Sequence, residues 1–469
     1  MERSEYTRLD ATGLRELIAG GEVSAAEVET VARAAIEAAD AVLNGLAQPL
    51  FDTALGHAED GPFGGVPLLL KDGPMAEGVE FNFGSRALNG IRARHDSDLM
   101  SRFRAAGFAA LGVTTVPELA LSFATEPVRT GPTRNPWDLD RGVGGSSGGA
   151  AALVAAGAVP IAHANDAAGS IRIPAACCGL VGLKPSRGRV PTGPDIADPA
   201  FGAASEFAVT RTVRDAMRLL RAIEGPGVGD KYEAPPLRTY AEKLGTDGRP
   251  KWPVAVSTRS WSGGTVDPEV AAVTEKAARL VEEWGYHVVP AQPELDWEDV
   301  VQAATAEAVA LAAPFLNAPR RPDPEQLEAV SRQILAEADA LSAMDLVRML
   351  DAQNRVSRRI GAFFTEHELL ITPTLARLPP PHGTLSSDRR GYTVESWLRA
   401  LFDVGPFTVP FNLGGQPAIS LPLGTSASGL PIGVQLVARY GREDLLLRFA
   451  AHFERVMPWQ DRVPPHGVR

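Results

Sequence analysis

Cysteine is scarce in this sequence of 469 residues: it has two, Cys177 and Cys178, and they are adjacent. Adjacent cysteines suit neither a disulfide framework nor a zinc site, because both need partners or ligands spaced along the chain. We interpret the pair as two small side chains of a buried core. The eight histidines are scattered, with no two of them four residues apart, so the sequence predicts no metal centre.

Long apolar runs are lacking too. None reaches the roughly 18 residues that a membrane-spanning helix requires. The first residues, MERSEYTRLDATG, have neither the basic start nor the apolar core of a signal peptide. Positive charge is in deficit, with 46 Lys and Arg against 57 Asp and Glu and a net charge of −11, which argues against a general nucleic-acid-binding surface. We therefore expect a cytoplasmic protein that binds neither nucleic acid nor membranes.

The sequence does have the hydrophobic content of a globular protein, 45%. Helical periodicity follows the capping-box pair Ser24 and Glu27, and further helices are predicted over 97–106, 148–158 and 442–456. Strands are predicted over 65–72, 108–114, 159–166, 253–260, 287–289, 369–374 and 431–438. This alternation predicts an α/β fold with a mixed central β-sheet covered by helices on both faces.

We predict a single domain over residues 1–469, because no repeat, low-complexity tract or linker divides the chain. The stretch 297–362 has a mostly helical pattern, which fits an insertion or a cap over one end of the sheet. Two segments rich in proline and glycine, 184–205 and 375–392, are predicted to be irregular.

Residues 142–170, GVGGSSGGAAALVAAGAVPIAHANDAAGS, hold three serines: Ser146, Ser147 and Ser170. The glycine-rich start is no phosphate-binding loop, since no lysine follows it, and no dinucleotide fingerprint is present. A linker would have polar rather than apolar flanks. The run leads directly into a helix of small residues, which favours close backbone approach at a helix N-terminus.

Small residues also precede Ser170. The backbone N–H groups of Ala167, Ala168, Gly169 and Ser170 can converge on one point and stabilise an oxyanion, with Ser170 placed as a nucleophile. Taken alone, the segment fits an ordinary turn serine that caps the next stretch better than it fits a nucleophile.

A nucleophilic serine needs a base. His163 is the one histidine near the segment, but its PIAHAND setting indicates a strand interior, and the absence of G-x-S-x-G disfavours an α/β-hydrolase triad. Lys71 ends an apolar strand, GVPLLLKD, where burial is costly unless the lysine pKa falls or a partner is found. A desolvated lysine is a competent base, whereas a snorkelling or ion-paired lysine is the alternative.

Together these segments resemble the amidase signature family. The resemblance rests on GGSSGG at 144–149, on Ser170 within NDAAGSIRIPAACCGLVGLKPSRGRVP, on Lys71, and on GPTRNPWD (131–138), LLITPT (369–374) and the segment 407–438. It covers nearly the whole chain. It implies Ser170 as nucleophile, Ser146 as a bridging serine after a cis Gly145–Ser146 peptide bond, and Lys71 as terminal base.

The same resemblance implies an oxyanion hole formed by the N–H groups of residues 167–170. Gly145, Ser147, Asp166 and Arg172 would give structural support, the last two as an ion pair bracing the loop. Two positions depart from the family pattern: Asn165 stands where Ser or Thr is common, and Ala168 where Gly is common. Alanine keeps its N–H but excludes backbone angles that glycine reaches, so we expect a slightly altered loop.

Within the family, HANDAAGSIRIPA, GQPAISLP and YGREDLLL resemble bacterial amidases of the 6-aminohexanoate cyclic dimer hydrolase type. The resemblance implies a hydrolase of small or hydrophobic amides whose chemistry extends to anilides, carbamates and esters. It implies no cofactor and is compatible with a homodimer. Residues from about 297 to 400 are expected to form a helical and loop embellishment that shapes the substrate pocket. Two alternatives stay open: the glutamine-hydrolysing subunit of a transfer-RNA-dependent amidotransferase, and a scaffold that has lost catalysis.

Overall fold

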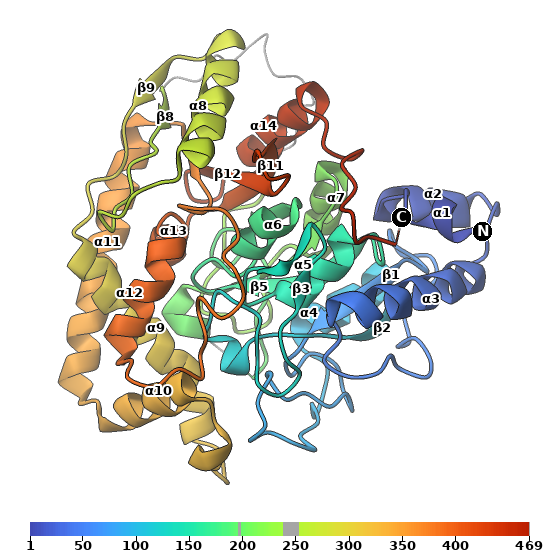
Figure 1. Ribbon diagram of the computed structural model, residues 1–469, viewed down its shortest axis with the longest axis horizontal. Helices are drawn as coiled ribbons and strands as arrows, with labels where there is room; N and C mark the ends of the chain where they lie inside the picture. Colours follow the sequence, from blue (N-terminus) through green and yellow to red (C-terminus); the bar gives the residue numbers. More distant parts are fainter. Residues whose placement is uncertain (196–197, 238–252, 469) are drawn as a thin grey trace.

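The computed structural model describes residues 1–195, 198–237 and 253–468. Its centre is a ten-stranded sheet with the strand order β2-β1-β5-β7-β6-β11-β12-β10-β8-β9 (Figure 1). The strands are β1 (Pro67–Lys71), β2 (Ala109–Thr114), β5 (Ile161–Asp166), β6 (Val181–Lys184), β7 (Ser205–Thr210), β8 (Val254–Val256), β9 (Val288–Pro290), β10 (Leu369–Pro373), β11 (Ala418–Thr425) and β12 (Pro431–Ala438). A separate small hairpin pairs β3 (Arg134–Asn135) with β4 (Asp138–Gly142).

The large sheet is mixed, as predicted. Its two ends are parallel, β2 with β1 and β5 at one end and β10 with β8 and β9 at the other. Between them, β7, β6, β11 and β12 pair antiparallel with their neighbours. Most central strands are buried along their whole length, as expected for a sheet with helices on both faces.

Helices flank this sheet (Figure 1). They are α1 (Arg3–Tyr6), α2 (Ala11–Ala19), α3 (Ala25–Leu43), α4 (Asp98–Ala106), α5 (Gly148–Ala155), α6 (Arg172–Cys178), α7 (Val213–Ile223), α8 (Pro268–Glu283), α9 (Trp297–Leu316), α10 (Ala329–Ala340), α11 (Ala343–Glu366), α12 (Val394–Val404), α13 (Pro410–Leu413) and α14 (Glu443–Val456). Helices α5 and α6 contact each other, as do α7 and α14, and both pairs lie against the central strands. The predicted α/β architecture is therefore present.

Local signals placed several elements correctly. Ser24 caps α3 in the predicted capping box, and Gly107 ends α4 in the left-handed conformation. Every predicted strand is present, although β8 is shorter than the predicted 253–260. Helix α5 ends at Ala155 rather than at residue 158, because Gly157 turns the chain with φ +85°. Strands β6, β7 and β11 were not predicted.

The stretch after residue 297 is helical, as predicted. Helix α9 contacts α10, α11 and α12, and together they form a group of helices beside the sheet (Figure 1). By length and a mean hydropathy of 1.3, α9 is also the one helix among the described residues that is apolar enough to cross a membrane. We interpret it as a core helix, because it packs against three neighbouring helices and its own acidic side chain, Glu307, is buried in the protein interior.

The sheet brings the candidate residues together. Strands β1 and β5 are parallel neighbours, so Lys71 and Asp166, their last residues, lie at the same edge. The segment before α5 supplies Ser146 and Ser147, and the turn between β5 and α6 supplies Ser170. Residues 75 to 99 positions apart in sequence can therefore meet at one point.

Candidate active site

The side-chain nitrogen of Lys71 contacts both the glycine–serine run before α5 and the end of β5, which leads into the turn of Ser170. Its Nζ lies 2.7 Å from Ser146 Oγ and 2.9 Å from Ser147 Oγ, both in the glycine–serine run. It also lies 2.6 Å from Asn165 Oδ1 at the end of β5. The lysine that the sequence placed at the end of a buried strand is thus fully engaged by polar neighbours.

Burial governs the chemistry of this lysine. Lys71 is 2% exposed, and burial lowers its pKa from 10.5 to about 7, against the nearby carboxylates of Glu206, Asp166 and Asp72, which raise it. A lysine with a pKa near 7 is largely neutral in mildly alkaline solution. In that state its nitrogen has a lone pair and can accept a proton.

The glycine–serine run is a closely packed segment rather than a spacer. The Gly145–Ser146 peptide bond is cis, as the family resemblance implies. A methyl group on Gly145 would lie 2.7 Å from the Ser122 carbonyl oxygen, and one on Gly149 would lie 2.4 Å from the Gly45 carbonyl oxygen. Glycine is required here because neighbouring backbone approaches too closely for any side chain.

Ser170 lies in the turn between β5 and α6 and is 6% exposed. Its Oγ forms no hydrogen bond with any described residue, and so the structure does not join it to Ser146 directly. The N–H groups of Ala168, Gly169 and Ser170 likewise have no acceptor within residues 1–195, 198–237 and 253–468. Three backbone donors beside an unengaged hydroxyl can meet a ligand oxygen.

The backbone angles of the loop show which of its residues needs glycine. Ala168 lies outside the left-handed region, and the residue that adopts an unusual backbone angle is Gly169, with φ +142°. A side chain at 169 would also come within 2.6 Å of both Ile173 Cδ1 and Thr408 Oγ1. The backbone angle at position 168 does not require glycine, so alanine is accommodated there without strain.

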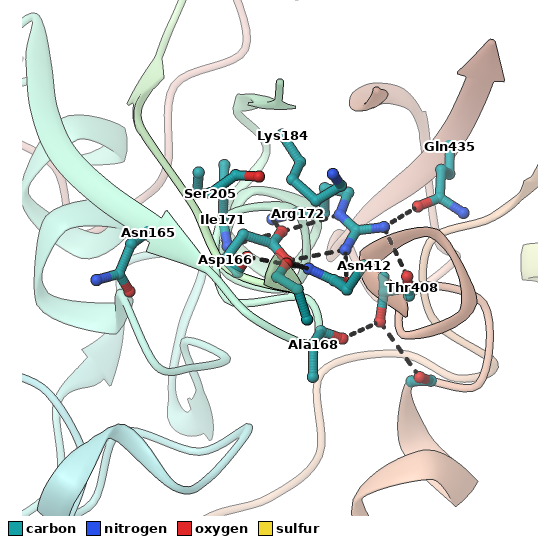
Figure 2. Close-up of polar contacts among 12 residues, drawn as sticks. Asn165, Asp166, Ala168, Ile171, Arg172, Lys184, Ser205, Thr408, Asn412 and Gln435 are labelled. Carbon is teal, nitrogen blue, oxygen red and sulfur yellow. Dashed lines mark hydrogen bonds and ion pairs between the residues drawn. The ribbon is translucent and has the colours of Figure 1, made fainter. Parts of the chain in front are cut away.

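Behind the turn, the expected ion pair between Asp166 and Arg172 is present (Figure 2). Both side chains are fully buried, with Arg172 Nε 2.9 Å and Nη2 2.8 Å from the two carboxylate oxygens. Asp166 Oδ2 also accepts hydrogen bonds from the backbone N–H groups of Ile171 and Arg172. Burial alone would raise the Asp166 pKa, but the guanidinium outweighs it and holds that pKa well below its usual range.

The segment 407–438 supplies the remaining contacts of this network. Arg172 donates to Thr408 O and Gln435 Oε1, and Asn412 Nδ2 donates to Asp166 (Figure 2). Thr408 Oγ1 donates to Ala168 O at 2.6 Å, which fixes the loop carrying the free N–H groups. Sequence reasoning matched this segment to the family but assigned no role to Thr408, Asn412 or Gln435.

Other predictions concern single residues. His163 lies inside β5 and is 1% exposed, as its sequence setting indicated. Cys177 and Cys178 are unpaired, buried side chains of α6, and burial raises the pKa of Cys177 to about 12. Over the part of the chain that the structure describes, no group of three or more His, Cys, Asp or Glu side chains is arranged to hold a metal ion.

Comparison with known proteins assigns the chain to a family. Residues 27–447 match the family model described as Amidase. The 6-aminohexanoate-cyclic-dimer hydrolase of Paenarthrobacter ureafaciens is 39% identical, over 97% of this chain and 96% of that protein. A structure of 6-aminohexanoate cyclic dimer hydrolase complexed with substrate superposes with a TM-score of 0.91 at 38% identity, covering 98% of this chain and 99% of that one.

A more distant structure is that of a glutamyl-tRNA(Gln) amidotransferase subunit from Thermotoga maritima. Its TM-score is 0.75 at 26% identity, over 100% of this chain and 98% of that one. All of these proteins share the fold and match this chain almost end to end. The chain belongs to the amidase signature family, and it is a hydrolase that acts on the C–N bonds of amides.

Proposed function

We propose that this amidase is a serine hydrolase in which Ser170 is the nucleophile, Ser146 the bridging proton carrier and Lys71 the base. The observation that carries the proposal is the 2.7 Å contact between Lys71 Nζ and Ser146 Oγ, made by a lysine whose pKa is lowered to about 7 by burial. A neutral lysine at this distance can take the Ser146 proton and leave Ser146 able to take another.

In the proposed first half-reaction, Ser170 Oγ attacks the amide carbonyl carbon as its proton passes to Ser146 and the Ser146 proton passes to Lys71. The oxyanion of the tetrahedral intermediate is stabilised by the N–H groups of residues 167–170. When the C–N bond breaks, the proton held by Lys71 returns through Ser146 to the leaving nitrogen. The amine departs and the acyl group stays on Ser170 as an ester.

In the second half-reaction, water attacks this ester and loses its proton to the same relay. Collapse of the second intermediate breaks the bond to Ser170 Oγ, and Ser170 regains a proton as the carboxylic acid leaves. The open contact between Ser170 and Ser146 in the free enzyme is consistent with this sequence, because catalytic hydrogen bonds commonly shorten once substrate is bound. Ser147 holds Lys71 Nζ at 2.9 Å, and Gly145, Asp166 and Arg172 support the geometry from positions further back.

For the substrate, we propose a small amide with an apolar acyl group, linear or cyclic. Apolar side chains lie close to the nucleophile turn: a side chain at Gly169 would come within 2.6 Å of Ile173 Cδ1, and one at Gly405 would lie 2.9 Å from that same atom and 3.2 Å from Phe123 Cε2. The Phe123 ring lies 6.2 Å from that of Phe402 on α12. The 39% identity with a 6-aminohexanoate-cyclic-dimer hydrolase supports aminohexanoate amides as the first compounds to test.

Anilides, carbamates and esters pass through the same type of oxyanion, so their cleavage is part of the proposal. Three further expectations stay predictions: that residues 297–400 shape the substrate pocket, that the protein is cytoplasmic, and that it forms a homodimer. The glutamine-hydrolysing alternative is supported by the likeness to the amidotransferase structure, whose 26% identity is below the 38–39% of the cyclic dimer hydrolases.

The test is product formation, measured by mass spectrometry, on matched amides, anilides, carbamates and esters, with glutamine and a cyclic aminohexanoate dimer included. Ser170→Ala is compared with the wild type and with Ser101→Ala, which removes an exposed hydroxyl from α4. We expect Ser170→Ala to lose about a thousandfold or more in rate and Ser101→Ala to be unchanged. Activity of the wild type on glutamine alone would favour the amidotransferase alternative, and full activity of Ser170→Ala would refute the assignment.

A further inference from the structure

Glu206 is a largely buried carboxylate close to Lys71, and the proposed mechanism gives this carboxylate no role. It lies on β7, directly opposite Asn165 of β5, and its side chain is 18% exposed. One of its oxygens, Oε2, lies 2.8 Å from His163 Nε2, and the other, Oε1, lies 3.2 Å from Asn165 Nδ2. Both neighbours in turn contact Lys71.

The first contact fixes the tautomer of His163. The backbone N–H of Lys71 donates to His163 Nδ1 at 3.2 Å, so Nδ1 must carry the lone pair. In a neutral imidazole the proton is then on Nε2, which donates it to Glu206. Through His163, Glu206 therefore holds the backbone of the strand end from which the Lys71 side chain leaves.

The second contact fixes the amide orientation of Asn165. Since Asn165 Nδ2 donates to Glu206, Asn165 presents Oδ1 to Lys71 as a pure acceptor. Alternation along β5 explains the arrangement: Asn165 points to one face while Asp166 points to Arg172 on the other (Figure 2). His163, two residues before Asn165, shares its partner Glu206.

These acceptors determine where the lone pair of a neutral Lys71 points. Ser147 Oγ donates to the backbone carbonyl of Asn165 at 3.3 Å, and so it accepts from Lys71. A neutral lysine has two N–H groups, and Asn165 and Ser147 occupy both. The lone pair that remains is directed at the third neighbour, Ser146, 2.7 Å away.

We propose that Glu206 is a positioning residue of this active site: through Asn165 and His163 it directs the lone pair of Lys71 at Ser146. Its carboxylate also favours the ammonium form of Lys71, against the larger effect of burial on the lysine pKa. This inference rests on the proposed role of Lys71. It also gives a reason for Asn165, where the family resemblance leads one to expect Ser or Thr. The amide meets the two partners through two different atoms: Oδ1 accepts from Lys71 and Nδ2 donates to Glu206.

The charged groups around this cluster are few. Glu206, Asp166 and Asp72 act on Lys71, and each carboxylate favours the ammonium form against the effect of burial. On its other side, Glu206 lines a surface cavity with Arg187, Asp230 and Lys231. Of the three carboxylates, Asp166 is paired with Arg172 and Asp72 accepts the N–H groups of residues 82 and 84, which leaves Glu206 as the one directly linked to the partners of Lys71.

The test is the pH dependence of kcat/KM for an amide, with Glu206→Gln beside the wild type. Glutamine keeps the size of the side chain and removes its charge, so the acid limb should move to lower pH by about one unit. Glutamine also cannot accept from both His163 and Asn165, so the plateau value of kcat should fall about tenfold, with KM changed less. Glu454→Gln is the matched control: its carboxylate, on α14, accepts the Val213 N–H, and its profile should equal that of the wild type.

Asn165→Ala separates orientation from charge. It should lower kcat while leaving the acid limb within about 0.3 units of the wild type, because Glu206 keeps its charge. In the Asn165→Ala background, Glu206→Gln should cost less than about twofold in kcat and still shift the limb. Circular dichroism confirms that each variant is folded at the temperature of the assay.

An unshifted acid limb in folded Glu206→Gln, with Ser170→Ala inactive, would overturn the role of Glu206 and leave the proposed function standing. Full activity of Ser170→Ala, or a wild-type profile with no acid limb when chemistry is rate-limiting, would instead overturn the proposed function itself. The two failures are therefore distinguishable in one set of measurements.

Discussion

Replacement of Arg172 by methionine tests the account of the buried network most sharply. Methionine keeps much of the length and apolar volume of the side chain but removes all five N–H donors. Asp166 would lose both contacts from the guanidinium, at 2.9 and 2.8 Å, while staying fully buried. The acceptors Thr408 O and Gln435 Oε1 would lose a donor each.

Breaking a buried ion pair by removing one partner costs about 3–5 kcal/mol, since an unpaired charge remains. Lost hydrogen bonds to buried carbonyl groups add to this cost and better apolar packing of methionine offsets part of it. We therefore expect Arg172→Met to lower the free energy of unfolding by about 3–5 kcal/mol at pH 7. The double variant Asp166→Asn with Arg172→Met should lose less, because the buried carboxylate charge is removed together with its partner.

The pH dependence has a definite sign. In the wild type the folded-state pKa of Asp166 lies below its usual range, so the pair contributes its full stability above the unfolded-state pKa. That contribution falls progressively as pH drops from the unfolded-state pKa through the folded-state pKa. In Arg172→Met, burial would raise the Asp166 pKa, and protonation would relieve the unpaired charge as pH falls. The deficit relative to the wild type should therefore be smaller at about pH 4.5 than at pH 7.

Urea unfolding followed by circular dichroism at both pH values measures this difference. A free energy of unfolding for Arg172→Met within about 1 kcal/mol of the wild type at pH 7 would refute the reasoning, because it would mean that the ion pair contributes little to stability. A deficit that grows toward the lower pH would show that the sign is wrong.

Three further predictions follow from single positions. Gly169→Ala should lower kcat/KM at least about a hundredfold in a steady-state amide assay, because a side chain there would clash with Ile173 and Thr408 and because φ +142° is unfavourable for alanine. The control Ala168→Gly should stay within about threefold of the wild type. The wild-type pH profile of kcat/KM should have an acid limb near pH 7, since activity requires neutral Lys71 and rises as pH passes the lowered pKa; a limb near pH 4 would contradict this role. Glu307→Met should raise the unfolding midpoint at pH 8, because it removes a buried carboxyl whose Oε1 has no hydrogen-bond partner among the described residues, a cost of about 1–3 kcal/mol. The gain should shrink toward about pH 4.5, because burial raises the Glu307 pKa, and an equal gain at both pH values would exclude that cause.

The sequence was informative where the signals are local. The position of Lys71 at the end of an apolar strand predicted that it is buried and that burial lowers its pKa. The small residues before Ser170 predicted the turn there. The capping box at Ser24 and the glycine that ends α4 depend on backbone rules that act within a few residues. The family motifs predicted that the serine segments and the lysine form one site, and the structure brings Ser146 and Ser147 to Lys71.

Long-range pairing could not be read in the same way. Strand β7 was not predicted, and so Glu206, which pairs across from Asn165, had no place in the predicted site. Thr408 and Gln435 reach Arg172 from positions more than 230 residues away in the chain, and nothing in their own segment shows which group they meet. Ala168 was judged against the family pattern, whereas its actual backbone angle decides whether glycine is needed.

The central claim is that the acyl group is carried by Ser170, and covalent trapping tests it most directly. The enzyme is mixed with an activated apolar ester, quenched in acid within the first turnover, and its intact mass is measured. The tryptic peptide 142–172 contains Ser146, Ser147 and Ser170 together, and so fragmentation of this peptide identifies the modified residue. We expect one acyl group, on Ser170, and none in Ser170→Ala. An acyl group on another residue, or equal labelling of Ser170→Ala, would contradict the assignment of Ser170 as the nucleophile.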